Sequence, residues 1–122
     1  MTTNKLERII KYNFNNVNLL KEALIHSSYS SRNCKNNKTN YERLEFLGDR
    51  VLGLVLAEYV FHVFPQANEG LLNSYYQKYV SQEYLSNYSK KIHLSNFIKT
   101  QKGDKIDNNK SILSDVVESI IG

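Results

Sequence analysis

The stretch NYERLEFLGDRVLGLVLAEYVF, residues 40–61, decides the fold of this chain. It is the most apolar part of the sequence, and its apolar residues recur at helical spacing, so a helix is predicted over about residues 40–64. The first half of the stretch nevertheless carries Glu42, Glu45 and Asp49. Because a helix this apolar belongs inside a domain, the three carboxylates need an explanation.

The rest of the chain reads as shorter helices joined by polar loops. Glycine is scarce and Pro65 is the one proline, so the sequence has too few turn-forming residues for a many-stranded β-sheet. Apolar residues recur at helical spacing in residues 6–12, 16–28, 69–80, 82–94 and 111–122. Two polar stretches, residues 30–40 and 100–110, are predicted loops. The pattern indicates an all-α, bundle-like domain.

Length and composition favour a single intracellular domain. A chain of 122 residues is enough for one compact core. No apolar run is long enough to cross a bilayer, and the first residues lead into no signal-peptide core, so no membrane partner is expected. The lone Cys34 excludes an internal disulfide, and its polar surroundings suggest an exposed thiol without a task. A cytoplasmic protein is predicted.

The net charge of +4 is unevenly distributed along the chain. Residues 1–39 hold seven Lys/Arg and two Asp/Glu, whereas residues 40–122 hold nine and ten. A basic first third beside an acidic cluster suits a polyanion-binding surface next to a cation site, although small domains often carry such patches. Arg32, Lys35 and Lys38 are candidate phosphate contacts, and a solvated loop explains them equally well.

The three acids of the central helix share one narrow face. At about 100° per residue, Glu42, Glu45 and Asp49 occupy an arc of about 60°, and Phe46 lies near them on the polar side. The opposite side is predicted to face the core. It carries Leu44, Leu47, Gly48, Val51, Leu52, Leu54, Val55 and Tyr59.

Two simple explanations compete with a functional one for this acidic face. Acidic stripes are usually solvated, and Thr39 with Glu42 forms a capping box at the predicted helix start. However, like charges on adjacent turns repel, and no Lys or Arg on the same arc balances them. The stripe is therefore a candidate for a bound cation.

A second acidic pair near the end of the chain strengthens this candidate. Asp115 and Glu118 are three residues apart inside an otherwise apolar run, where carboxylates cost free energy unless they are paired or bind a metal. If the two helices pack face to face, Glu45, Asp49, Asp115 and Glu118 converge. Ligation by oxygen alone selects Mg²⁺ or Mn²⁺ over Zn²⁺. Spacing alone leaves a metal site and solvated acids equally open.

Four segments share a recognisable pattern. In chain order they are FNNVNLLKEALIHSSYS, YERLEFLGDRVLGLVLAEYVF, FPQANEGLL and SILSDVVESIIG, and they span residues 14–122. Together they resemble the ribonuclease III family. The resemblance implies an all-helical endonuclease domain over residues 1–122 that uses Mg²⁺, with Mn²⁺ as an alternative, to hydrolyse double-stranded RNA. It further implies a role in processing rRNA, mRNA or tRNA precursors, and a dimer that cuts both strands.

The resemblance also implies roles for single residues. Glu45, Asp49, Asp115 and Glu118 match the family's metal-binding carboxylates. Asp49 and Glu118 are catalytic in this assignment, and Glu42 matches a further acid of the catalytic motif.

Two other positions match residues of the family's dimer. Phe46 matches an aromatic residue that inserts into the second subunit of a two-fold homodimer. Glu69 matches an acid near the dimer partner, although an exposed loop acid is the plainer explanation.

Some positions depart from the family pattern. Arg50 stands where a small residue is usual, and Tyr75 and Tyr76 replace Leu-Arg, which puts some RNA or packing contacts in doubt. Residues 1–122 are expected to hold the catalytic domain without the family's C-terminal double-stranded-RNA-binding domain, and the last catalytic-domain helix is expected to be truncated.

The remaining predictions concern histidines and alternative functions. His26, His62 and His93 lack metal-ligand spacing and are predicted to be structural. The alternatives are a non-catalytic RNA-binding or scaffold protein of the same fold, and an acidic helical interaction module without an RNA role.

Overall fold

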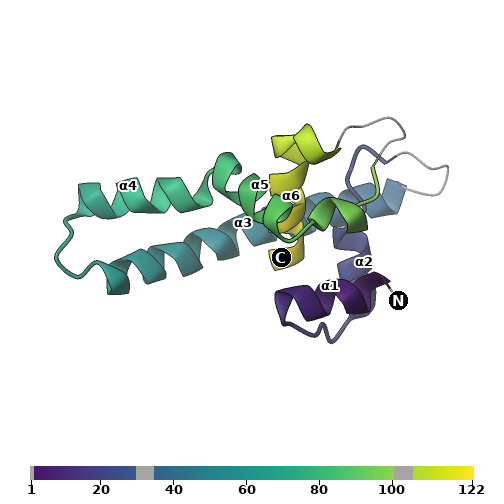
Figure 1. The fold of residues 1–122 in the computed structure, drawn as a ribbon, viewed down its shortest axis with the longest axis horizontal. Helices are drawn as coiled ribbons and strands as arrows, with labels where there is room; N and C mark the ends of the chain where they lie inside the picture. Colours follow the sequence, from purple (N-terminus) through teal and green to yellow (C-terminus); the bar gives the residue numbers. More distant parts are fainter. Residues whose placement is uncertain (1, 30–34, 101–105) are drawn as a thin grey trace.

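The computed structural model describes residues 2–29, 35–100 and 106–122, and their regular structure is helical (Figure 1). The elements are α1 (Thr2–Ile10), α2 (Val17–Ala23), α3 (Lys35–Val63), α4 (Glu69–Val80), α5 (Gln82–Lys91), the 3₁₀ turns η1 (Leu94–Phe97) and η2 (Ile106–Asn108), and α6 (Lys110–Ile121). An isolated parallel bridge joins Ile25 to Lys99. The all-α prediction is confirmed.

Some predicted features fall outside this description. Cys34 and Arg32 lie outside the described residues, and so do the side chains of Lys35 and Lys38. Among the residues that were described, no helix is both long and apolar enough to span a membrane.

Helix α6 is the centre of the core. It packs against α3, α5 and α2, and its apolar residues Ile112, Leu113, Val116 and Val117 are all buried. The other members of the core cluster are Leu6, Leu20, Leu24, Tyr41, Leu85, Leu94 and Ile98. Each buried Leu, Ile or Val contributes about 1.5–3 kcal/mol, so α6 is firmly anchored.

Asparagine and serine side chains define where four of the helices begin. Asn16, Asn68 and Asn109 each accept a hydrogen bond from a backbone N–H in the first turn of α2, α4 and α6. Ser81 does the same for α5. Each cap provides a partner for a backbone N–H that has none within the helix, and contributes about 1 kcal/mol to stability. The cap at Asn109 also fixes the start of the helix that carries Asp115 and Glu118.

Helix α3 begins earlier than predicted. Its first residue is Lys35, so the second half of the predicted loop over residues 30–40 is helical. Polar Lys and Asn residues give no apolar periodicity, but a helix anchored at buried Tyr41 extends through them at little cost. Thr39 therefore lies inside the helix, and the capping-box explanation of Glu42 is wrong.

The apolar side of α3 is largely exposed, contrary to the prediction that it faces the core. We call Phe46, Leu47, Val51, Leu54, Val55 and Phe61 the outer face, and all six are exposed, with Leu54 at 72%. Gly48 is buried, and Leu44 and Leu52 are partly buried as predicted. An apolar stripe looks the same in sequence whether it covers its own chain or another one. Phe46, predicted to lie off the core, is 61% exposed.

Helices α3 and α4 form a long antiparallel hairpin that extends away from the other helices (Figure 1). Tyr75 stacks on Phe64 with ring centroids 4.2 Å apart. The hydroxyl of Tyr76 lies against Gly53, only 2.8 Å from where a Cβ on that glycine would be. The two tyrosines that depart from the family pattern therefore pack the hairpin together.

Candidate metal centre

The candidate centre forms where α3 and α6 cross in backbone contact. A Cβ on Gly48 would lie 1.6 Å from the carbonyl oxygen of Glu118, so only glycine fits at this position. Gly48 lies between Glu45 and Asp49 on α3, and Glu118 lies directly opposite on α6. The close crossing therefore brings acids from distant parts of the sequence together.

Three of the four predicted ligands converge. Glu45, Asp115 and Glu118 each offer a carboxylate oxygen, and these three oxygens all lie within 4.8 Å of one another. Each of the three residues is partly buried. We call this group the acidic cluster. It matches the predicted convergence of the two helices at Glu45, Asp115 and Glu118.

Electrostatic repulsion is concentrated in the acidic cluster. Burial, reinforced by the charges of Asp49, Asp115 and Glu45, raises the pKa of Glu118 to about 7. Burial and Asp115 raise the pKa of Glu45 to about 6, and His26 opposes that rise. Carboxylates that share a partly desolvated site favour either protonation or a cation.

The acidic cluster fits a hard divalent cation. Its donors are all carboxylate oxygens, which Mg²⁺ and Mn²⁺ prefer. Two oxygens bound to one Mg²⁺ lie at most about 4.2 Å apart, so the observed spread needs only small side-chain rotations. The buried hydroxyl of Tyr41 has no hydrogen-bond partner among the described residues, although Glu45, Asp115 and Glu118 surround it closely enough to add to burial in raising its pKa. That orphaned polar atom is a further sign of a site built around a polar ligand.

Asp49, the fourth predicted ligand, is not part of the acidic cluster. It lies one turn along α3, its side chain is 50% exposed, and its carboxylate forms an ion pair with Arg50. The guanidinium of Arg50 also lies 4.5 Å from the ring centroid of Phe46. Asp49 remains close enough to contribute, after burial, to the raised pKa of Glu118.

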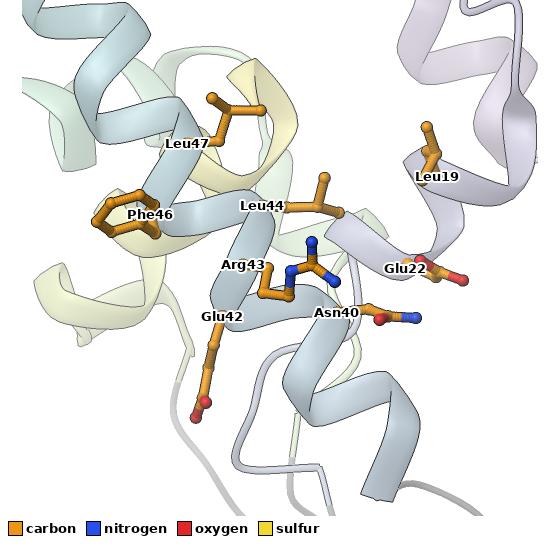
Figure 2. Close-up of a pocket in the computed structure, with 8 residues that line it drawn as sticks. All are labelled: Leu19, Glu22, Asn40, Glu42, Arg43, Leu44, Phe46 and Leu47. Carbon is orange, nitrogen blue, oxygen red and sulfur yellow. The ribbon is translucent and has the colours of Figure 1, made fainter.

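Glu42 and Glu69 also lie outside the acidic cluster. Glu42 is exposed and lines a hollow of about 830 Å³ between α2 and α3, where its side chain points away from Phe46 and Leu47 (Figure 2). Glu69 is exposed at the first residue of α4, where an acid is favourable to the helix dipole.

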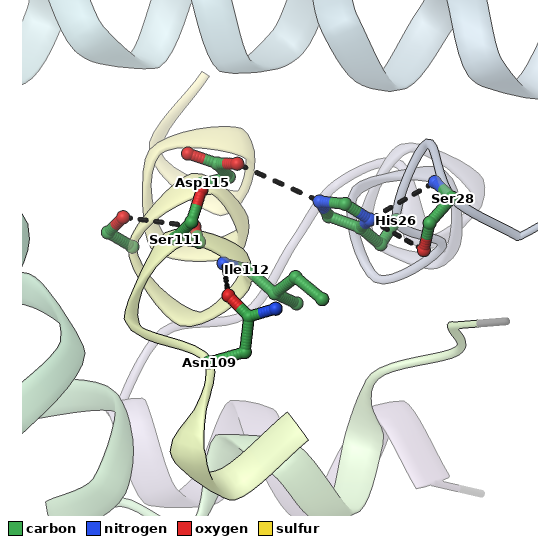
Figure 3. Close-up of polar contacts among 7 residues, drawn as sticks. His26, Ser28, Asn109, Ser111, Ile112 and Asp115 are labelled. Atoms are coloured by element: carbon green, nitrogen blue, oxygen red, sulfur yellow. Dashed lines mark hydrogen bonds and ion pairs between the residues drawn. The ribbon is translucent and has the colours of Figure 1, made fainter. Parts of the chain in front are cut away.

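His26 and Tyr41 adjoin the cluster and were missed by the sequence analysis. Nε2 of His26 lies 3.7 Å from Oδ2 of Asp115 (Figure 3). The His26 and Tyr41 rings pack edge to face, with their centroids 5.3 Å apart. His62 and His93 are exposed, and the carboxylate beside His62 is that of Glu58, which is not part of the acidic cluster. The sequence carries only a weak signal for His26, because no other histidine or cysteine stands at a typical metal-ligand spacing from it.

The Glu118→Gln variant is expected to stabilise the metal-free protein at pH 8. The folded-state pKa of Glu118, about 7, lies above its ordinary value of 4.5. As pH rises between those values, the unfolded chain releases this proton before the folded chain does, so the free energy of unfolding falls. Removing the charge should raise the free energy of unfolding by about 1–2 kcal/mol at pH 8, after discounting for solvent screening, and by little at pH 5. Thermal unfolding in EDTA at both pH values measures this.

The exposed acid Glu58 offers a matched control. Glu58 lies on α3 with 70% of its side chain exposed, so Glu58→Gln should change the unfolding temperature little at either pH. A Glu118→Gln variant that is no more stable than the wild type at pH 8 would argue against repulsion in the cluster.

A family model and individual relatives both relate this chain to ribonuclease III proteins. Residues 16–122 match the family described as Ribonuclease-III-like. The chain is 42% identical over 125 residues to Ribonuclease 3 of Ehrlichia ruminantium, a match that covers 100% of this chain and 54% of that protein. Ribonuclease 3 of Caldanaerobacter subterraneus is 40% identical over 119 residues, which cover 95% and 52% of the two chains. The chain thus spans about half the length of these relatives.

A solved structure agrees with the sequence relationship. The nuclease domain of ribonuclease III from Campylobacter jejuni matches with a TM-score of 0.83 and 37% identity, over 95% of this chain and 79% of that one. That structure concerns flexibility in a region involved in dimer formation.

Proposed function

Because the chain belongs to the ribonuclease III family, we propose that it is a metal-dependent endoribonuclease that hydrolyses phosphodiester bonds in double-stranded RNA. One observation carries the proposal. Three carboxylates from α3 and α6 meet within 4.8 Å at a point where the two backbones touch. A solvated acidic face would not need such a crossing. The convergence also disfavours a non-catalytic scaffold, which has no use for mutually repelling acids.

Each acid has a proposed part in this reaction. Glu45, Asp115 and Glu118 would hold the ion, and Asp49 would add a fourth carboxylate by turning away from Arg50. A bound Mg²⁺ or Mn²⁺ supplies a water of lowered pKa and neutralises the charge that develops on the phosphate. No histidine or serine nucleophile is required. Glu42, the third acid of the proposed catalytic set, would act from outside the cluster.

Double-stranded RNA is the proposed substrate, recognised by shape. Side chains do not reach the bases of the deep major groove of A-form RNA, so phosphates and 2′-hydroxyls would be contacted instead. Phosphate contacts make affinity fall as salt rises. The proposed setting is cytoplasmic processing of rRNA, mRNA or tRNA precursors, with residues 1–122 as catalytic domain.

Incubation of the purified chain with a long RNA duplex and Mg²⁺ tests the proposed activity. We expect cleavage that stops when EDTA is added and is absent with single-stranded RNA of the same sequence. A folded chain that binds duplex RNA in a salt-dependent way but leaves it intact would favour the scaffold alternative. A chain that shows no such binding would favour the interaction module.

We also propose that the outer face of α3 is the interface of a two-fold homodimer. Six large apolar side chains exposed along one helix are typical of an interaction site. Phe46 projects from it, and the adjoining hollow is lined by Leu19, Leu44 and Leu47 (Figure 2). In a two-fold interface both copies use the same surface, so a projecting ring beside a recess can engage its counterpart. The Campylobacter relative also has a region involved in dimer formation, which supports a dimer without locating its interface.

Replacing Phe46 is expected to weaken the dimer. An aromatic ring buried in an interface typically contributes about 1 kcal/mol or more, and a two-fold dimer would lose two such rings, so Phe46→Ala should raise the dissociation constant by about tenfold or more. Sedimentation velocity over a concentration series measures this. Tyr88→Ala is the control, because Tyr88 is an exposed aromatic residue, at 44%, that lies on α5 and not on α3. An unchanged sedimentation profile for Phe46→Ala would contradict the interface.

We propose that Glu69 lies near the partner subunit. It stands at the start of α4, and Glu69→Ala should change the dimer's dissociation constant less than Phe46→Ala, because an exposed acid contributes little.

A further inference from the structure

His26 is held in place at its backbone. The His26 N–H donates to the carbonyl of Lys99 at 2.9 Å, and the Lys99 N–H donates to the carbonyl of Leu24 at 2.8 Å. These bonds tie the segment after α2 to the segment after η1. The position of His26 relative to the core is therefore fixed before any side-chain contact is considered.

The ring of His26 is fixed as well. Its side chain is only 11% exposed, and one ring edge packs against the fully buried Tyr41. The backbone N–H of Ser28 donates to Nδ1 at 3.1 Å, and Oγ of Ser28 lies 2.9 Å from the same nitrogen. A ring nitrogen that accepts from a backbone N–H carries no proton, so in the neutral ring the proton is on Nε2.

That proton faces the acidic cluster. Nε2 lies 3.7 Å from Oδ2 of Asp115, as Figure 3 shows, at a distance where the interaction is electrostatic rather than a full hydrogen bond. Asp115 is itself anchored by α6, whose first turn is capped by Asn109. One carboxylate oxygen of Asp115 thus faces a fixed donor, while the same carboxylate group offers an oxygen to the acidic cluster.

We propose that His26 is a positioning residue that uses its Nε2–H to orient the Asp115 carboxylate for cation binding. The inference rests on the proposed metal site, and it assigns a task to a residue that contributes no ligand atom. Partners that orient a ligating side chain typically change metal affinity by about 10–100-fold when they are removed. Ser28 acts through His26, because its backbone N–H donates to Nδ1 and so determines that the proton is on Nε2.

The test compares replacements that differ in where they put a donor. A glutamine amide can place its nitrogen near the position of Nε2, whereas a shorter asparagine amide reaches only the position of Nδ1. We expect His26→Gln to keep Mn²⁺ affinity within about threefold of the wild type. His26→Asn and His26→Leu should each weaken it by about tenfold or more. Electron paramagnetic resonance of free Mn²⁺ during titration of the 122-residue chain measures affinity without RNA or turnover.

Two controls separate positioning from folding. His62→Leu removes an exposed histidine that also lies near a carboxylate, at 3.9 Å from Glu58, and should leave Mn²⁺ affinity unchanged. Long-range ¹H–¹⁵N spectra of the wild-type imidazole report the tautomer directly, and do so even if a variant fails to fold. We expect the proton on Nε2.

The outcomes are distinguishable. Equal Mn²⁺ affinity of the Gln and Asn variants, or a wild-type proton on Nδ1, would overturn the positioning role and leave the metal site standing. A wild-type chain that binds no Mn²⁺ would overturn the metal site, and the positioning role with it. The expected order, with Gln near wild type and Asn and Leu weaker, supports both.

Discussion

The Glu118→Gln variant is expected to lose cleavage of duplex RNA by at least about a hundredfold. Glu118 offers one of the three converging oxygens, and burial and neighbouring charges raise its pKa to about 7. An amide of the same shape keeps the packing but removes the negative charge that would hold a cation. Initial cleavage rates of a labelled duplex, measured across a range of Mg²⁺ concentrations, give the loss.

Two companion measurements identify the cause of that loss. RNA binding by Glu118→Gln, measured without divalent ions, should remain within about threefold of the wild type, because phosphate contacts come from basic groups. Its unfolding temperature should not be lower than that of the wild type, since the substitution relieves repulsion. Wild-type turnover in this variant would refute the proposed role of Glu118.

The Gly48→Ala variant is expected to destabilise the fold and remove cation binding together. The added Cβ would meet the Glu118 carbonyl oxygen at 1.6 Å and its carbonyl carbon at 2.6 Å. These are backbone atoms that no rotamer change can move, so α3 and α6 must separate. We expect a loss of about 3 kcal/mol or more in the free energy of unfolding, measured by urea denaturation.

Gly53→Ala is the matched control on the same helix. Its Cβ would lie 2.8 Å from the hydroxyl of Tyr76, which is the end of a side chain and can shift. The gain of about 1 kcal/mol in helix propensity should offset much of that adjustment, so the net change should be small. A Gly48→Ala chain as stable as Gly53→Ala, with unchanged Mn²⁺ affinity, would argue against the close crossing.

Much of the fold was predictable because helices leave a periodic signal. The boundaries of α4 match residues 69–80, and the caps at Asn68 and Asn109 follow known preferences. The start of α3 was not predictable, since Lys and Asn residues carry no periodicity. The orientation of α3 was also missed, because Leu47 and Leu54 look equally suited to a core and to an interface.

The candidate site was predictable only in part, for a related reason. Acid spacing brought Glu45, Asp115 and Glu118 onto facing helices, but it could not show that Asp49 turns toward Arg50. It also could not show that His26, far away in sequence from both acidic pairs, packs beside Asp115. Contacts between distant segments depend on how helices pack, and local pattern does not contain that information.

The crossing at Gly48 also sets the order in which the protein acquires its chemistry during synthesis. The acidic cluster draws on α3 and on α6, the last helix of this sequence, so α1 to α5 together provide only part of it. Those helices emerge from the ribosome first and can begin to form. A nascent chain in which α6 has not yet been made thus lacks Asp115 and Glu118, two of the three carboxylates. For the proposed ribonuclease, a nascent chain without α6 cannot assemble the acidic cluster.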